Sequence, residues 1–260
     1  MRALLVLLLC GPLTALTAHA ADAMADFDRA RRRSGVWVSL GAAVGALSFA
    51  SDTAAYDASV DGLATLGLGV DLWPEEHLGL YLGAQLGLGA SLETPSLGVA
   101  LDYNVHQVDL GARYRWHLGP QPTALAPFVA VGLRVVRQET QDQVPALLVR
   151  STSAGPEFAA GLEWPLAGER LWLRVAGRLG LPFFLRESPD DSGDPQDFIA
   201  FGGRLEAIAA LTGPWSAQAQ LDVQTQQIRF QGEGTRAASV FGARTEDRFV
   251  VATLGVRRSF

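Results

Sequence analysis

The stretch Leu78–Leu92, with the sequence LGLYLGAQLGLGASL, decides the fold. Its even-numbered positions carry leucine or alanine, and its odd-numbered positions carry glycine, tyrosine, glutamine or serine. A period of two is typical of a β-strand whose two faces meet different surroundings. The stretch is roughly twice as long as an ordinary strand, and a membrane-spanning strand needs about 9–11 residues. It therefore predicts a strand that crosses a membrane with one apolar face.

The same alternation recurs from Gly35 to the end of the chain and predicts about ten strands, within a range of about eight to twelve. Further stretches that carry it are Val36–Phe49, Val60–Leu72, Val108–Trp116, Val129–Val135, Glu157–Trp164, Leu171–Leu179, Arg204–Leu211, Ala217–Gln224 and Arg248–Phe260. Short turns (Pro74–Glu76, Gly119–Pro120, Ala167–Gly168, Gly213–Pro214) alternate with longer polar segments (Ser51–Ala58, Gln138–Val144, Glu187–Asp197, Gln231–Glu246). Because every backbone polar group must be paired in hydrocarbon, we expect an all-β, closed antiparallel transmembrane barrel with an up-and-down meander.

The composition excludes several other classes. Of 260 residues, 48% are hydrophobic and 18% are charged, whereas soluble domains carry about a quarter charged residues. Past residue 20, no run approaches the roughly 20 apolar residues of a spanning helix. The net charge is −6, and every basic residue is arginine, so no basic stripe for nucleic acid is expected. A soluble exported β-sandwich or lipocalin-like barrel is the alternative fold.

The first twenty residues predict a cleaved secretory signal peptide. Arg2 supplies the positive start, Ala3–Leu9 the apolar segment and Ala18–Ala20 an A-x-A cleavage site. Cleavage after Ala20 removes Cys10, the only cysteine, so a disulfide scaffold is excluded. Lipidation of Cys10 is disfavoured because Leu9 precedes it. The expected organisation is a signal peptide (1–20), a short periplasmic segment (21–34) and a barrel domain (35–260).

All six tryptophans fall at strand ends that face a short turn or the start of the first strand. Indole rings favour the membrane interface, so these residues predict a periplasmic aromatic girdle. They are Trp37, Trp73, Trp116, Trp164, Trp172 and Trp215. A weaker girdle is expected at the opposite rim from Phe49, Tyr56, Phe184, Phe198 and Phe230.

The face opposite the apolar one carries charges of both signs. The basic members are Arg113, Arg115, Arg134, Arg174, Arg178, Arg204 and Arg257, and the acidic members are Asp71, Asp109, Glu157, Glu163, Glu206 and Asp222. Inside a narrow barrel these charges must pair, because an unpaired buried charge is costly. Either a plugged lumen or a narrow charged pore satisfies this pattern, whereas a wide diffusion pore needs about 16–18 strands.

The C-terminal residues TLGVRRSF (253–260) resemble the assembly signal of the Gram-negative outer-membrane β-barrel superfamily, which includes small porin-like proteins. Thr253, Gly255 and Phe260 match the polar residue, the glycine two positions later and the terminal aromatic residue. Arg258 departs from the pattern, which has a hydrophobic residue there. The resemblance implies an outer-membrane location in a Gram-negative bacterium. It also implies contact with outer-membrane lipid and lipopolysaccharide and with the barrel-assembly machinery.

The sequence predicts no catalytic, metal or cofactor site. Omptin proteases use Asp and His at the outer rim, and lipid A deacylases use a His–Ser pair on a strand; neither arrangement is found. His77 and His117 lie beside periplasmic turns, and His106 is expected to form hydrogen bonds in the lumen beside a bulge near Gln107. In the acidic loop Glu187–Asp197, the spacing of Asp190, Ser192 and Asp194 begins a calcium loop, but the rest of that loop is missing. A solvated outer loop is therefore expected.

The leading functional prediction is a non-enzymatic outer-membrane protein, either structural or a narrow porin-like channel with a charge-paired lumen. A surface adhesin or ligand-binding barrel that acts through the loops Gln138–Val144, Glu187–Asp197 and Gln231–Glu246 is the alternative. A barrel enzyme that processes lipid or peptide is a third possibility. No ligand, solute or oligomeric state follows from the sequence.

Overall fold

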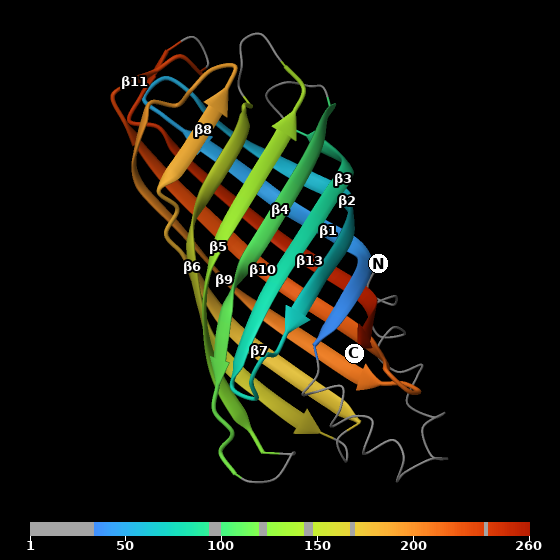
Figure 1. Ribbon diagram of the computed structural model, residues 1–260. Helices are drawn as coiled ribbons and strands as arrows, with labels where there is room; N and C mark the ends of the chain where they lie inside the picture. The colour runs from blue at the N-terminus through green and yellow to red at the C-terminus, as the bar shows by residue number, and fades with distance from the viewer. Residues whose placement is uncertain (1–33, 94–99, 120–123, 143–147, 167–169, 237–238) are drawn as a thin grey trace.

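The protein forms a closed barrel of ten antiparallel strands in the computed structural model, which describes residues 34–93, 100–119, 124–142, 148–166, 170–236 and 239–260 (Figure 1). The predicted signal peptide and residues 21–33 lie outside the described residues. The ring comprises β1 (Gly35–Ala50), β2 (Ala55–Leu72), β3 (Leu78–Glu93), β4 (Ala100–Arg115), β5 (Ala126–Thr140), β6 (Arg150–Leu166), β7 (Leu171–Gly180), β9 (Asp194–Ala210), β10 (Trp215–Gln231) and β13 (Arg244–Ser259).

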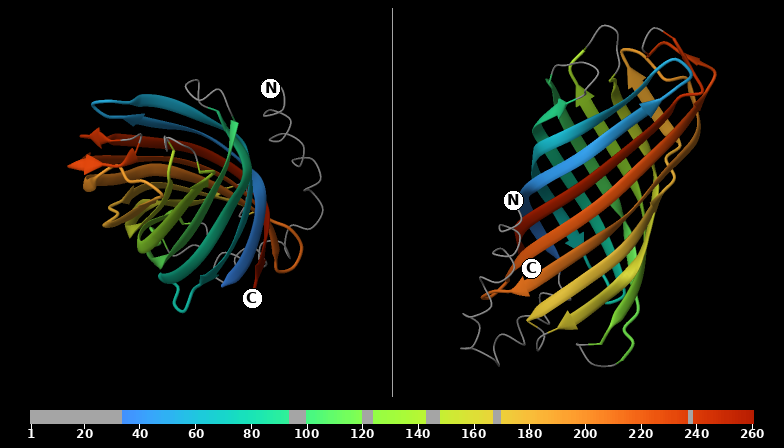
Figure 2. Two further views of the ribbon diagram at one scale, coloured as in Figure 1. Left: turned by 90° about the horizontal axis from the view of Figure 1, so that it is seen from above. Right: turned by 180° about the vertical axis from the view of Figure 1, so that it is seen from behind.

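Neighbouring strands follow one another around the ring, and β13 closes it by pairing with β1 from Gly35–Ser259 to Ala50–Arg244 (Figure 2). A short strand, β8 (Phe184–Ser188), continues the chain beyond β7 and pairs with β6. The pair β11 (Glu233–Gly234) and β12 (Val240–Phe241) forms a small sheet of its own. Among the described residues, no helix is long and apolar enough to cross a membrane.

The half of the barrel near the strand termini Gly35 and Ser259 has an apolar outer face. On β1 and β13 the side chains of Leu40, Leu254 and Val256 are 66%, 55% and 43% exposed. Their neighbours across the sheet are also apolar, as in the Leu40–Leu254 and Leu40–Leu66 pairs. A continuous exposed apolar band is the surface expected against lipid tails. We call this half, with the short turns, the lower half.

The other half, called the upper half below, reverses the pattern. Its interior is an apolar cluster that includes Leu47, Phe49, Val60 and Leu92. Its outer face carries polar residues such as Arg248, Arg229 and Glu139. This is the arrangement of a water-soluble sheet with a buried apolar face. The strands therefore extend beyond the membrane, as their length of 15 to 18 residues in β1–β5 allows.

Two β-bulges lie where the pattern reverses. Gly62 in β2 and Gly89 in β3 have φ angles of +74° and +73°, and both strands shift register there against a neighbour. The bulge in β2 places Val60 and Leu63, three residues apart, on the same inner face. The bulge expected near Gln107 is thus on the neighbouring strand: β4 alternates regularly through Gln107, and His106 faces outward.

Candidate functional site

The lower lumen contains a layer of ion pairs centred on Glu163. This fully buried carboxylate accepts charge-assisted contacts from three arginines on two strands, β4 and β7. Its oxygens lie 3.0 Å from Arg174 Nε, 3.4 Å from Arg115 Nη1 and 3.8 Å from Arg113 Nη1. Arg174 also donates to Glu206 at 2.5 Å, so the layer joins β4, β6, β7 and β9.

A second layer lies next to the first, one step higher in the barrel. Arg178 donates to both oxygens of Glu157, at 3.0 and 2.8 Å, and to Asp222 at 2.6 Å. Arg134 bridges Glu157 at 2.8 Å and Asp109 at 3.3 Å, and Arg204 contacts Asp222 at 2.7 Å. Because each side chain in this layer contacts an opposite charge, the desolvation cost of the charges is offset.

The rim of the lower half holds a further pair, Arg257 with Asp71 at 2.6 Å. The structure thus places every predicted lumen charge inside the barrel and brings all of them into contact with an opposite charge. The residues are Arg113, Arg115, Arg134, Glu157, Glu163, Arg174, Arg178, Arg204, Glu206 and Asp222, together with Asp71, Asp109 and Arg257.

Three of the six tryptophans point inward and are not part of an outward girdle, which corrects the prediction for Trp37, Trp73 and Trp172. The Trp37 ring lies over Gly67 and Gly69, where a Cβ atom would meet it at 3.1 and 2.5 Å. The guanidinium carbons of Arg115 and Arg174 lie 3.7 and 4.6 Å from the ring centroids of Trp73 and Trp172. The cation–π attraction to lumen arginines and the space left by glycine favour the inward orientation.

The remaining tryptophans occupy the outer surface of the lower rim. Trp116, Trp164 and Trp215 are 44%, 56% and 45% exposed. Phe260 is also exposed at this rim, where its amide donates to the Ser34 carbonyl at 2.9 Å, while Thr253 is buried and Gly255 packs closely against Ser39. The role of Thr253, Gly255 and Phe260 in assembly stays a prediction.

At the opposite rim, three of the five aromatic residues expected outside are buried inside. Phe49, Tyr56 and Phe230 belong to the apolar cluster of the upper lumen, and Phe198 is half-buried and packs against that cluster, whereas Phe184 is exposed. The rings turn inward because the outer face at this height is polar, and the barrel interior offers the apolar surroundings that they require.

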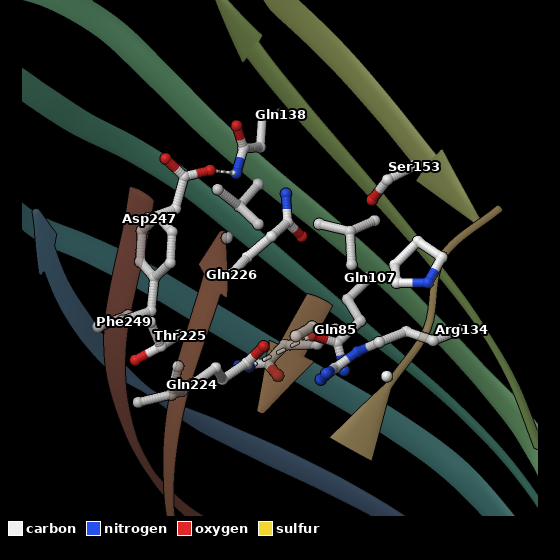
Figure 3. A pocket seen from close by; sticks show the side chains of 18 of the residues that line it. Gln85, Gln107, Arg134, Gln138, Ser153, Gln224, Thr225, Gln226, Asp247 and Phe249 are labelled. Carbon is white, nitrogen blue, oxygen red and sulfur yellow. Dashed lines mark hydrogen bonds between the residues drawn. The ribbon is translucent and has the colours of Figure 1, made fainter. Parts of the chain in front are cut away.

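Above the ion pairs lies a cavity of about 60 Å³ (Figure 3). Arg134 borders it, and the side chains of Gln107 and Gln224 meet across the lumen at 3.4 Å. Gln138 donates to Asp247 at 2.8 Å. Apolar residues such as Val136 and Phe249 complete the lining. The cavity thus combines apolar walls with amide groups and lies between the charged lower lumen and the apolar upper cluster.

Arg236 closes the upper mouth. This loop arginine is 5% exposed, and its guanidinium lies 4.2 Å from the centroid of the Phe49 ring. The guanidinium also donates hydrogen bonds to the Tyr56 hydroxyl and, at 3.0 Å, to Ser192 Oγ. Glu187 lies 3.6 Å from Arg236 and accepts from the Ser192 amide at 2.6 Å. Burial raises the pKa of Glu187, although Arg236 and the Ser192 hydrogen bonds oppose this.

The acidic segment Glu187–Asp197 is therefore not a freely solvated loop. Ser192 is fully buried and contacts a guanidinium, and Asp194–Asp197 already belong to β9. Among the described residues, no group of three or more His, Cys, Asp or Glu side chains is arranged to hold a metal ion.

The three histidines of the barrel domain lie apart from the cavity. His77 and His117 pack together at the short turns of the lower half, with ring centroids 5.7 Å apart. His106 was expected in the lumen, but it lies on the outer face with Nε2 3.7 Å from Glu139. Regular alternation in β4 assigns the inner face to Gln107 and thus the outer face to His106.

Comparisons with known proteins identify the fold. No family model matches the sequence, and no curated protein does. Among solved structures, the chain is similar to the outer membrane protease OmpT from Escherichia coli, with a TM-score of 0.60 and 10% sequence identity over 88% of this chain and 97% of that one. It also matches the outer membrane protein OprG from Pseudomonas aeruginosa, with a TM-score of 0.41 and 14% identity over 88% and 97% of the two chains.

The chain has the fold of Gram-negative outer-membrane β-barrels. The exposed apolar band of the lower half is the outer surface that a membrane-spanning barrel of this fold presents to lipid. Sequence identity this low carries over the fold alone, so the site must be interpreted from its own residues.

Proposed function

We propose that the protein is a non-enzymatic outer-membrane barrel of structural type, whose ion-paired lumen blocks the free passage of ions and hydrophilic solutes. The observation that carries the proposal is the pair of charge layers around Glu163 and Arg178. They join strands on opposite sides of the lumen through direct contacts of 2.5 to 4.0 Å.

The energetics of buried charge support a closed lumen. An ion that passes would have to separate pairs such as Arg178–Glu157 and Arg174–Glu206, and breaking a buried pair costs about 3–5 kcal/mol. The flanking tryptophan rings on Arg115 and Arg174 add further attraction. A narrow porin-like channel needs weakly held charges along an open path. The paired arrangement therefore favours a plug over a channel.

The positions of the histidines support the non-enzymatic part of the proposal. A general base must lie within hydrogen-bond reach of the proton that it removes. His106 faces outward beside Glu139, and the His77 ring contacts the Arg115 carbonyl at 3.1 Å next to a periplasmic turn. Neither residue lines the cavity, which contains amides, Arg134 and Asp247; His106 points away from it, although its neighbours Val105 and Gln107 belong to the lining.

Recording of single channels in planar bilayers tests the proposal. The wild-type barrel should show no stable conductance steps. The double variant Arg178→Ala/Glu157→Ala keeps the net charge and leaves two intact pairs, Arg134–Asp109 and Arg204–Asp222, and it should raise the leak. The matched control Arg137→Ala/Glu139→Ala removes an exposed pair with a 2.7 Å contact and should leave the leak unchanged. Regular ohmic steps in the wild type would contradict the closed lumen and favour the narrow channel.

A further inference from the structure

The barrel wall is split between β8 and β9. The β7–β9 ladder ends at Gly180 and Ala200. Beyond it the chain stays with β6: Leu181 N donates to the Pro156 carbonyl at 3.0 Å, and Phe183 N donates to the Ala154 carbonyl at 3.1 Å. The upper part of β9 pairs with β10 alone. Over residues 181–199, all of which the structure describes, no ladder joins β8 to β9.

Two residues explain why the wall separates here. Pro182 follows the last rung by two positions, where an amide would next face β9, and proline has no amide hydrogen to donate. On β6, Gly155 lets the chain approach closely, because a Cβ atom there would lie 2.3 Å from Pro182 Cα. The sequence thus directs residues 181–183 onto β6 and away from β9.

The outer side of this split is apolar. Leu181, Phe183, Phe184, Ile199 and Phe201 are 43%, 78%, 46%, 39% and 45% exposed. At the same height the adjoining strands are polar outside, since Ile199 is paired with Gln227, and Gln227 with Glu246. The apolar outer surface therefore extends higher at the split than on the adjoining strands. An exposed apolar patch of this kind marks contact with lipid or a partner. Irregular backbone at membrane depth is tolerated where it lines a cavity.

The inner side of the split opens on the cavity of about 60 Å³. Gly155, Gly180, Pro182 and Ala200 all line this cavity, so only small side chains stand between it and the split. A second cavity of about 40 Å³ shares Gln138, Gln226 and Asp247 with the first. Tyr103 and Thr140 line it, and neither of their buried hydroxyl groups has a hydrogen-bond partner among the described residues.

A buried hydroxyl without a partner costs free energy, which a ligand with a polar group would recover. The amides of Gln138 and Gln226 offer both donors and acceptors nearby. The Asp247 carboxylate lines both cavities, and Arg134 already contacts the carboxylates of Asp109 and Glu157, so the cavities do not favour an anionic head group. Its volume is far below the roughly 150 Å³ that accepts a benzene ring, so the head group must be small.

We propose that the split between β8 and β9 is a lateral entrance through which an uncharged single-chain amphiphile binds from the outer leaflet. Its hydroxyl or amide head lies among Gln138, Gln226 and the Tyr103 hydroxyl, and its alkyl tail passes Ala200 and Phe183 into the membrane. This inference goes beyond the proposed function, because a lumen closed to ions is compatible with an entrance from the side.

Photolabelling of the full barrel in phosphatidylcholine vesicles tests the site. The probe is a long-chain alcohol with a diazirine next to its hydroxyl, and mass spectrometry locates the adducts. We expect lumen residues such as Gln138 and Tyr103 to be labelled, whereas the same alcohol with a diazirine at its methyl end should label Phe183 and Ile199. A phosphatidylcholine with a diazirine beside its head group tests whether a bilayer lipid binds instead, and it should label outer residues only.

Variants separate binding from access. Tyr103→Phe should lower lumen labelling roughly fivefold, the value of about one hydrogen bond, and should leave the barrel folded because that hydroxyl has no partner to lose. Tyr114→Phe, on the exposed lower rim, is the matched control and should label as the wild type. Leu181→Cys/Ile199→Cys in the mature chain should close the split when oxidised and abolish lumen labelling, and a reductant should restore it.

If the disulfide does not form, Ala200→Phe narrows the inner side of the split and should give the same loss. The proposal is overturned if the head-labelled alcohol modifies only outward residues of the wild type. It is equally overturned if closure or Ala200→Phe leaves lumen labelling unchanged, because the ligand would then enter elsewhere. Either result is independent of conductance, so it can be distinguished from a failure of the closed-lumen proposal.

Discussion

The lower and upper halves of the same strands follow opposite rules. In the lower half of β13, apolar side chains such as Leu254 and Val256 face outward, and Arg257 faces the lumen. In its upper half the charged side chains of Arg248 and Glu246 face outward, and Phe249 and Val251 contribute to the inner apolar cluster. The reversal occurs within one continuous ladder. The medium outside each half, lipid or water, therefore decides which face of a strand is apolar, and the opposite face lines the lumen.

The two interiors are consequently stabilised by different forces. The upper lumen gains from removal of apolar surface from water, as in a soluble protein. The lower barrel gains no such advantage, because its apolar residues are in contact with lipid. Its lumen is instead filled by charges that stabilise the fold only while each has its partners. The predictions below test this difference at the lower lumen, at the outer face and at the junction of the halves.

The largest effect is expected from Glu163→Ala. This change leaves Arg113, Arg115 and Arg174 without the carboxylate that they share, so the free energy of unfolding should fall by about 3–5 kcal/mol. Urea unfolding of the vesicle-inserted barrel, followed by tryptophan fluorescence, measures this. Glu139→Ala, in the upper half, removes a half-exposed partner of Arg137 and should cost less than about 1 kcal/mol. Equal losses in the two variants would refute the distinction between the halves.

A smaller effect is expected from an arginine on the outer face. Leu82→Arg, 52% exposed in the wild type and opposite Leu110, places a charge in the lipid-facing band and should cost about 2–4 kcal/mol. Ser59→Arg is the matched change on the exposed upper part of β2 and should be nearly neutral, because water surrounds that face. The same unfolding assay compares them. A comparable cost at Ser59 would move the membrane boundary upward and shorten the water-exposed half.

The smallest effect is expected at the junction. Gly62→Ala puts a Cβ atom on a residue with φ of +74°, where it meets nothing within 4 Å, so only the backbone conformation is penalised, by about 1–2 kcal/mol. Gly177→Ala, whose Cβ also meets nothing within 4 Å, should be neutral. If Gly62→Ala proves as stable as the wild type, the bulge does not depend on the left-handed glycine, and the exchange of the inner and outer faces of β2 has another cause.

The fold was predictable because the lower half has a clean period of two. The stretch Leu78–Leu88 alternates through residues that lipid and lumen select differently, and the pairing Leu80–Ala112 continues the same face on β4. The positions of the bulges were not predictable. One extra residue at Gly62 or Gly89 shifts the phase of the inward and outward alternation, and a count of alternating residues does not locate that residue. The prediction of a bulge at Gln107 placed the irregularity on the wrong strand of the pair.

The site was predictable in its charges and less so in its rings. An arginine in a lipid-facing position is so costly that Arg113, Arg174 and Arg178 had to face inward. Tryptophan has no such constraint, because its ring is stable at the membrane interface and also packs against arginine inside the lumen. Only the glycines opposite Trp37, at positions 67 and 69, indicated an inward ring in the sequence. The cavity and the split are formed by Gly155, Pro182 and Ala200, which are distant from one another in the sequence, so no local sequence pattern predicts them.

The pairing of β1 with β13 also constrains the order in which the molecule forms. Gly35 and Ser259 stand at the two ends of the barrel domain, so the seam that closes the ring joins the segments that are farthest apart in the sequence. Contacts between such distant segments carry a high loop-closure entropy and slow the folding rate. Until β13 is available, β1 and β10 present unpaired edges, and a nascent chain that lacks it is exposed to aggregation.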